Sequence, residues 1–212
     1  MKPIFKVILW AIAYFASFIL GSLTGLIHPA CYAYVGALLP FLTAFIYKGM
    51  VKAVPGFGAA SIMNGLVLIL FLIAGEADTV CVIGLIFLAA LSEFLKIKFQ
   101  SNPVKSLRWG FVPMAFSFFT YTAHWWTDTE GSLAAAVAEM RPGYDQLMIP
   151  VIDNVPVLIF VYLITIPIAI LAIRLATNKK MIPLGTVLFL EAGKADYAGD
   201  AVDEVGETSQ AD

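Results

Sequence analysis

Long apolar runs alternate with short polar gaps between about residue 7 and residue 173. A helix needs roughly 20 apolar residues to cross the hydrocarbon core of a bilayer, and the runs come close to this length. The pattern therefore predicts an all-α membrane protein with six transmembrane helices. Their expected bounds are Val7–Ile27, Ala30–Tyr47, Phe57–Ala74, Thr79–Leu95, Trp109–Trp126 and Ile149–Ile173.

The charges in the gaps predict the orientation. Basic residues concentrate before the first run and after the second, fourth and sixth, whereas Arg141 is the only Lys or Arg in the other gaps. Cytoplasmic loops of membrane proteins carry an excess of Lys and Arg. We therefore expect the N-terminus and the C-terminus to be cytoplasmic.

Composition supports a membrane domain and indicates where along the chain this domain ends. The chain is 60% hydrophobic and 13% charged, and a soluble domain usually carries about twice that charge. Residues 1–181 are expected to form one six-helix transmembrane domain. Residues 182–212 are expected to form an interfacial segment, Ile182–Leu190, followed by an acidic, disordered cytoplasmic tail. Nothing in the charge pattern indicates nucleic-acid binding.

The first run carries a stripe of small residues: Ala13, Ser17, Gly21 and Gly25 recur every four positions and share one helix face. Small residues at this spacing let two helices approach closely in lipid. Two interpretations remain open. The stripe packs against another helix of the same chain, or it is the docking face for a partner subunit.

The outer end of the fifth predicted helix combines flat aromatic faces with polar groups, in Tyr121, His124, Trp125, Trp126 and Asp128. Aromatic residues at this depth also serve simply as interface anchors. The mixture nevertheless suits a flat, partly polar ligand, held by stacking and a few directional hydrogen bonds.

The long outer loop that follows resembles a lid. Ser132–Met140 is expected to form a short helix, and Pro142 and Gly143 would break it. Tyr144 follows the break and is a further ligand candidate. Arg141 has two open interpretations: a surface salt bridge with Glu139 or Asp145, or a contact to an anionic or carbonyl group of a ligand.

Some polar residues fall at membrane depth, where unpaired polar groups are costly. Asn64 forms an interhelical hydrogen bond or contacts a ligand. Glu93 is expected to pair with Lys96 near the interface. Asp153 and Asn154 begin the sixth predicted helix, and either could lie beneath the lid.

The chain lacks the sequence motifs of common catalytic and metal sites, so no cofactor, metal or enzyme activity is expected. One rival interpretation is a membrane enzyme acting on lipid or peptide, with His124 and Asp128 as an acid–base pair four residues apart. Another is a scaffold membrane protein. Cys31 and Cys81 both fall at outer ends of spans. Two interpretations remain open: the two cysteines form a disulfide, or each serves simply as a small apolar residue.

Several of these segments resemble a known family. They are Arg108-Trp109-Gly110-Phe111 with Pro113, the Trp-rich outer end, the EMRPGYDQL element of residues 139–147, and the exit from Arg174 to Lys180. Together they resemble the S components of energy-coupling factor (ECF) transporters, and more narrowly the Trep_Strep group, also called the MptD family. The match is strongest from Trp109 to Met181, and the earlier part matches in architecture.

The resemblance implies a multi-pass protein of a prokaryotic cell membrane. It implies capture of a small vitamin-like or heterocyclic micronutrient at the outer face, and import with a T subunit and two ABC-type ATPases. The implied docking residues are Ala13, Ser17, Gly21 and Gly25. The ligand candidates are Tyr121, His124, Trp125, Trp126, Asp128, Arg141 and Tyr144, with Asn154 and Asn64 added from the polar residues above.

Overall fold

The computed structural model describes residues 3–178, and all regular elements in that range are helices. The expectations for residues 182–212 lie outside the described residues. The elements are α1 (Pro3–Leu23), η1 (Thr24–Leu26), α2 (Pro29–Tyr34), η2 (Val35–Ala37), α3 (Pro40–Ala53), α4 (Ala59–Ala74), α5 (Thr79–Lys98), α6 (Pro103–Met114), α7 (Ser117–Thr122), α8 (His124–Thr127), α9 (Thr129–Glu139), α10 (Tyr144–Ile152) and α11 (Val155–Thr177).

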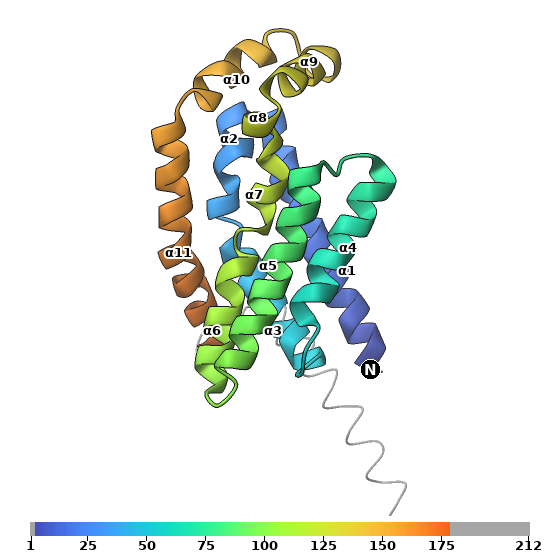
Figure 1. Cartoon of the computed structure of the whole chain (residues 1–212), viewed down its shortest axis with the longest axis vertical. Coiled ribbons are helices and arrows are strands. Elements are labelled where there is room, and N and C mark those ends of the chain that lie inside the picture. Colours follow the sequence, from blue (N-terminus) through green and yellow to red (C-terminus); the bar gives the residue numbers. More distant parts are fainter. Residues whose placement is uncertain (1–2, 179–212) are drawn as a thin grey trace, which may run out of the picture.

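The helices form an elongated bundle with two different ends (Figure 1). The start of α1, the α5–α6 turn and the end of α11 lie at one end, which we call the basal end. The short helices α9 and α10 lie across the opposite end, which we call the capped end. The two ends of the described chain therefore lie at the same end of the bundle.

Three of the predicted spans are confirmed as unbroken helices that are long and apolar enough to cross a membrane: Ile4–Leu26, Thr79–Lys98 and Val155–Thr177. The second predicted span is wrong as a single helix. It consists of Pro29–Ala37 and Pro40–Ala53, which are bent by 45° relative to each other. Pro40 has no backbone N–H and therefore begins a new helix instead of continuing the old one.

The fifth predicted span is also wrong as a single helix, because it is divided into α6, α7 and α8. Pro113 lies inside α6, and the spacing of the backbone hydrogen bonds shortens after it. The Phe116 amide donates to the Pro113 carbonyl, three residues earlier, instead of to a carbonyl four residues earlier. The tightened turn ends α6. A second break follows at Ala123, before the Trp-rich segment.

The sixth predicted span starts too early. Residues 149–152 belong to α10, and the chain turns before α11 begins at Val155. The side chain of Asn154 caps α11, and Pro156 occupies its first turn, where a missing N–H costs nothing. By length and composition, the described residues hold three membrane-crossing helices, or four if the bent pair is one span. The count of six remains a prediction.

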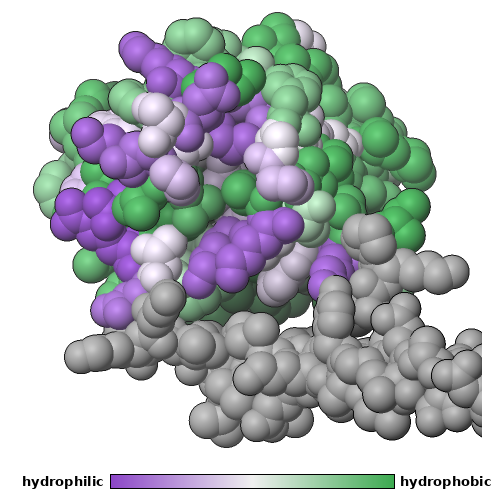
Figure 2. Space-filling view, turned by 90° about the horizontal axis from the view of Figure 1, so that it is seen from below, coloured by the Kyte–Doolittle hydropathy of each residue, from purple (hydrophilic) through white to green (hydrophobic). Residues whose placement is uncertain are grey.

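The surface and the core both suit a bilayer. Large apolar side chains such as Ile12, Ile83 and Leu163 are exposed along the helices, and a water-soluble monomer rarely exposes so much apolar surface. Tyr14, Tyr47 and other large side chains fill the core between the helices. Figure 2 shows the basal end, where hydrophilic residues gather over part of the face and hydrophobic residues cover much of the rest.

Candidate ligand site at the capped end

Five aromatic side chains from four helices pack together beneath the capped end. We call them the aromatic cluster: Tyr32, Phe71, Phe118, Tyr121 and Trp125. The rings of Phe71 and Tyr121 have centroids 4.5 Å apart, and those of Tyr32 and Trp125 lie 5.0 Å apart. The sequence alone indicated Tyr121 and Trp125. Tyr32 and Phe71 were missed because they are distant along the chain and meet the others only in the fold, and Phe118 was missed although it lies three residues before Tyr121 in α7.

The two tryptophans have different surroundings. Trp125 is only 5% exposed, so the interface-anchor interpretation is wrong for this residue. Trp126 is half-buried, and its indole N–H donates to the carbonyl of Ile152 at 3.1 Å. This bond connects α8 to the end of α10. Trp125 thus contributes its ring to the aromatic cluster, and Trp126 contributes a hydrogen bond to α10.

Polar groups border the aromatic cluster on one side. The hydroxyl of Tyr121 donates to the Glu76 carboxylate at 3.3 Å. His124 Nδ1 lies 2.7 Å from the carbonyl of Tyr121. Glu76 was missed as a site residue, although its position directly after the third apolar run was a usable signal.

The helix predicted in the long loop is confirmed, whereas its role as a lid remains a prediction. Ser132–Met140 was expected to be helical, and α9 covers Thr129–Glu139. Asp128 caps α9 by accepting a hydrogen bond from the Gly131 amide. The chain then turns at Gly143, whose φ of 81° lies in the left-handed region that favours glycine, before α10 begins. We call α9 and α10 together the lid.

Two further side chains fasten the lid to the end of the first span. The buried hydroxyl of Tyr144 donates to the Gly25 carbonyl at 2.8 Å. Arg141 Nη2 donates to the Ile27 carbonyl at 3.4 Å, from an exposed position. Of the two alternatives for Arg141, the salt bridge with Glu139 or Asp145 is wrong, because the only ion pair within residues 3–178 joins Glu93 and Lys96. The ligand contact remains a prediction. Burial raises the pKa of the Tyr144 phenol, and the Arg141 charge partly offsets the rise.

The small-residue stripe faces the interior. The Ser17 hydroxyl is fully buried and donates to the Tyr14 carbonyl. A Cβ atom at Gly21 would lie 2.6 Å from the Phe118 ring, and one at Gly25 would contact Tyr32 and Tyr144 at 3.4 Å. Packing within the chain is thus confirmed as the role of this stripe, in which Ala13 also contacts the core. The first helix as a partner interface remains a prediction.

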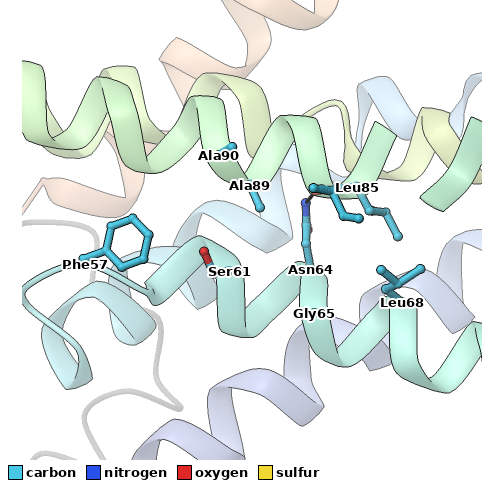
Figure 3. Close-up of a pocket in the computed structure, with 9 residues that line it drawn as sticks. Phe57, Ser61, Asn64, Gly65, Leu68, Leu85, Ala89 and Ala90 are labelled. Atoms are coloured by element: carbon cyan, nitrogen blue, oxygen red, sulfur yellow. Dashed lines mark hydrogen bonds between the residues drawn. The ribbon is translucent and has the colours of Figure 1, made fainter. Parts of the chain in front are cut away.

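The two asparagines are separate from the aromatic cluster. Asn64 donates to the Leu85 carbonyl at 3.0 Å and accepts from the Tyr14 hydroxyl at 3.1 Å, so the interhelical interpretation is confirmed. It borders a 230 Å³ cavity between α4 and α5 (Figure 3). Asn154 is exposed and accepts from the Val157 amide as the cap of α11. As ligand contacts, both remain predictions.

A comparison with protein families identifies this chain's family. The family described as hypothetical bacterial integral membrane protein (Trep_Strep) matches residues 2–180, which is most of the chain. The chain belongs to the Trep_Strep family. It is accordingly a bacterial integral membrane protein with several helical spans. No curated protein and no solved structure matches it.

The enzyme interpretation gains no support from the geometry of this Trep_Strep protein. His124 lies next to the Tyr121 carbonyl, and the Asp128 carboxylate caps α9, so each side chain makes its hydrogen bond elsewhere. Residues 3–178 contain no group of three metal-ligating side chains. Cys31 is exposed, Cys81 is buried, and both are free thiols, so the disulfide is not formed.

The basal end of the Trep_Strep protein holds a buried charge pair. Lys96 Nζ lies 3.0 Å from Glu93 Oε2, which confirms the predicted pair. The pair is buried inside the bundle, since the Glu93 side chain is 1% exposed and that of Lys96 is 7% exposed. Its location near the membrane interface remains a prediction. Glu93 Oε1 accepts from the Ala60 amide at 2.7 Å. The carboxylate therefore stabilises the first turn of α4, where helix N–H groups lack partners.

Proposed function

We propose that this Trep_Strep protein is the S component of an ECF-type ABC importer. In this proposal the chain crosses the membrane six times with both termini in the cytoplasm. It captures a small vitamin-like or heterocyclic micronutrient at the capped end and delivers it inward with a T subunit and two ATPases. The observation that carries the proposal is a two-helix lid fastened over an aromatic cluster at one end of a membrane bundle.

The chemistry of the capped end favours a flat ligand with polar edges. Tyr32, Tyr121 and Trp125 offer ring faces for stacking, which are common in sites for planar molecules. The Glu76 carboxylate can accept from ring N–H groups, and Arg141 on the lid can donate to a carbonyl or anionic group. A heterocycle with donors on one edge and a carbonyl on another fits this set.

Ligand entry requires the lid to move. The rings of the aromatic cluster already pack on one another, so a ligand must replace some of these ring contacts. Side chains of Trp126, Arg141 and Tyr144 fasten the lid through single hydrogen bonds to backbone carbonyls. Each such bond is worth only about 1 kcal/mol net, so thermal opening is accessible. Gly143 separates α9 from α10 and serves as the hinge.

Energy for transport must come from partners, because the sequence has no phosphate-binding loop. The buried stripe on α1 leaves the opposite face of this helix for contact. That face exposes Ile8, Ile12 and Ile19, with the small Ala16 between them. A partner helix can approach closely at a small residue, so Ala16 replaces the buried stripe as the proposed contact point.

Ligand capture can be tested with the full chain purified from its native host in mild detergent. Released small molecules are identified by mass spectrometry after denaturation. We expect one heterocyclic compound at near-equal molar amount. Trp125→Leu should bind it about 2- to 13-fold more weakly and release correspondingly less, since an aromatic contact contributes about 0.5–1.5 kcal/mol beyond its buried area. Trp109→Leu at the basal end is the matched control and should retain the compound. Equal recovery from both variants would contradict the proposed site.

A further inference from the structure

A second cavity lies at the basal end, between α6 and α11. It has a volume of 180 Å³ and combines cationic and apolar walls. Lys105, Arg108 and Val112 are three to four residues apart and share one face of α6, and Ile170 and Arg174 share one face of α11. The lining residues are Lys105, Arg108, Trp109, Val112, Ile170 and Arg174.

The cations around this cavity have no carboxylate partners within residues 3–178. The ion pair found there joins Glu93 to Lys96 and leaves Lys105, Arg108 and Arg174 unpaired. The other carboxylates of this range lie in the loops and helices of the capped end: Glu76, Asp78, Asp128, Glu130, Glu139, Asp145 and Asp153. The positive potential at this cavity is therefore not neutralised by the described part of the chain.

Arg108 also carries an unsatisfied donor. Its Nε atom is buried and has no hydrogen-bond partner among the described residues. Buried N–H groups are nearly always paired, because an unpaired donor loses the bonds that water would give it. An anion in the adjacent cavity would accept this hydrogen bond and balance the charges.

We propose that this cavity binds the phosphate group of an anionic phospholipid. Arginine suits phosphate because its planar guanidinium donates two parallel hydrogen bonds. Val112 and Ile170 give the cavity apolar walls, which fit the start of an acyl chain but add nothing for a free phosphate ion. Trp109 is 43% exposed and stacks on Phe99, as is common for tryptophan at a membrane interface.

The bound lipid would join two elements that are distant in the sequence. α6 begins the broken span α6–α8, and α11 is the last span of the described chain. A phosphate held by Arg108 and Arg174 would stabilise the packing of α6 against α11 at the basal end. This inference does not depend on the proposed transport role, nor on which side of the membrane the basal end faces.

The test is a lipid titration of the purified full chain, followed by native mass spectrometry. The probes are phosphatidylglycerol and phosphatidylcholine with the same acyl chains. We expect phosphatidylglycerol to bind at least about tenfold more tightly, since an anionic headgroup gains attraction from each nearby Lys or Arg. Arg108→Gln and Arg174→Gln should each weaken its binding about fivefold.

The controls are Lys52→Gln, an exposed basal cation outside the cavity, and Arg141→Gln at the capped end. Both should bind phosphatidylglycerol like the wild type. Arg174 is exposed at the end of α11, so its variant keeps the test valid if Arg108→Gln fails to fold. The proposal is overturned if phosphatidylcholine binds equally well, if Lys52→Gln weakens binding as much, or if millimolar inorganic phosphate displaces the lipid.

Discussion

The lid latch at Tyr144 gives the sharpest prediction. Tyr144 is 3% exposed, and its hydroxyl donates to the Gly25 carbonyl at 2.8 Å. Tyr144→Phe keeps the ring and its packing but removes the donor. With the lid closed, the buried Gly25 carbonyl then lacks this hydrogen-bond donor. With the lid open, water can donate to the carbonyl instead. The substitution should therefore favour the open lid.

The magnitude follows from the burial of both partners. Leaving a buried acceptor without its hydrogen bond costs about 1–3 kcal/mol. If the open state escapes this cost, the lid-opening equilibrium shifts about 5- to 150-fold. Amides of α9 and α10 exchange with solvent through this opening, so their exchange rates should rise by the same factor.

The assay is hydrogen–deuterium exchange followed by mass spectrometry of peptides from residues 129–152. Peptides from α4 and α5 should exchange at the wild-type rate, which separates lid opening from global unfolding. Tyr162→Phe is the matched control, because its hydroxyl has no hydrogen bond among those of residues 3–178 and its ring packs on Phe116 and Phe119. Wild-type exchange of α9 and α10 in Tyr144→Phe would refute the latch.

Three further predictions concern stability and pH. Gly21→Ala should lower the free energy of unfolding by about 1–3 kcal/mol in a thermal or denaturant melt, because its Cβ would lie 2.6 Å from the Phe118 ring. Gly65→Ala should not lower it, because a Cβ at that position would enter open space. Glu93→Gln should lower the free energy of unfolding by about 3–5 kcal/mol in the same assay, because it leaves the buried Lys96 charge unpaired. The control Glu139→Gln, at an exposed position, should change it by less than about 0.5 kcal/mol. The pKa of Tyr144 is raised, so its neutral, donating form persists above the ordinary range. The exchange ratio of Tyr144→Phe to wild type should therefore be the same at about pH 7 and about pH 10, where an ordinary tyrosine is half ionised, and a ratio that falls toward one at the higher pH would contradict this.

Hydrophobic patterning predicted the helical class and the long spans, because run length depends only on local composition. It also located α9 and the turn at Gly143, where local turn chemistry decides the structure. The breaks at Pro40 and after Pro113 were missed, although both prolines were visible in the sequence. Membrane helices tolerate some prolines and not others, and that outcome depends on neighbouring helices.

The candidate site was predicted only in part, for a similar reason. Tyr121 and Trp125 lie in one short segment and could be recognised there. Tyr32 and Phe71 join them only through packing between helices, so no local pattern links them. Phe118 lies three residues before Tyr121 on α7, and this spacing was a usable signal that the sequence analysis missed. The roles of Ser17 and Gly21 depended on which side of α1 faces the bundle, which four-residue spacing alone cannot decide.

The importer proposal is tested most directly by recovering the partners. The tagged chain is purified from its native host in mild detergent, and the bound proteins are identified by mass spectrometry. We expect a T subunit and two ABC-type ATPases with the wild type. We expect their loss in Ala16→Trp and their retention in Leu163→Trp, which places the same Trp side chain at an exposed position on α11. Recovery of the chain alone, from cells shown to express an energising module, would contradict the proposed function.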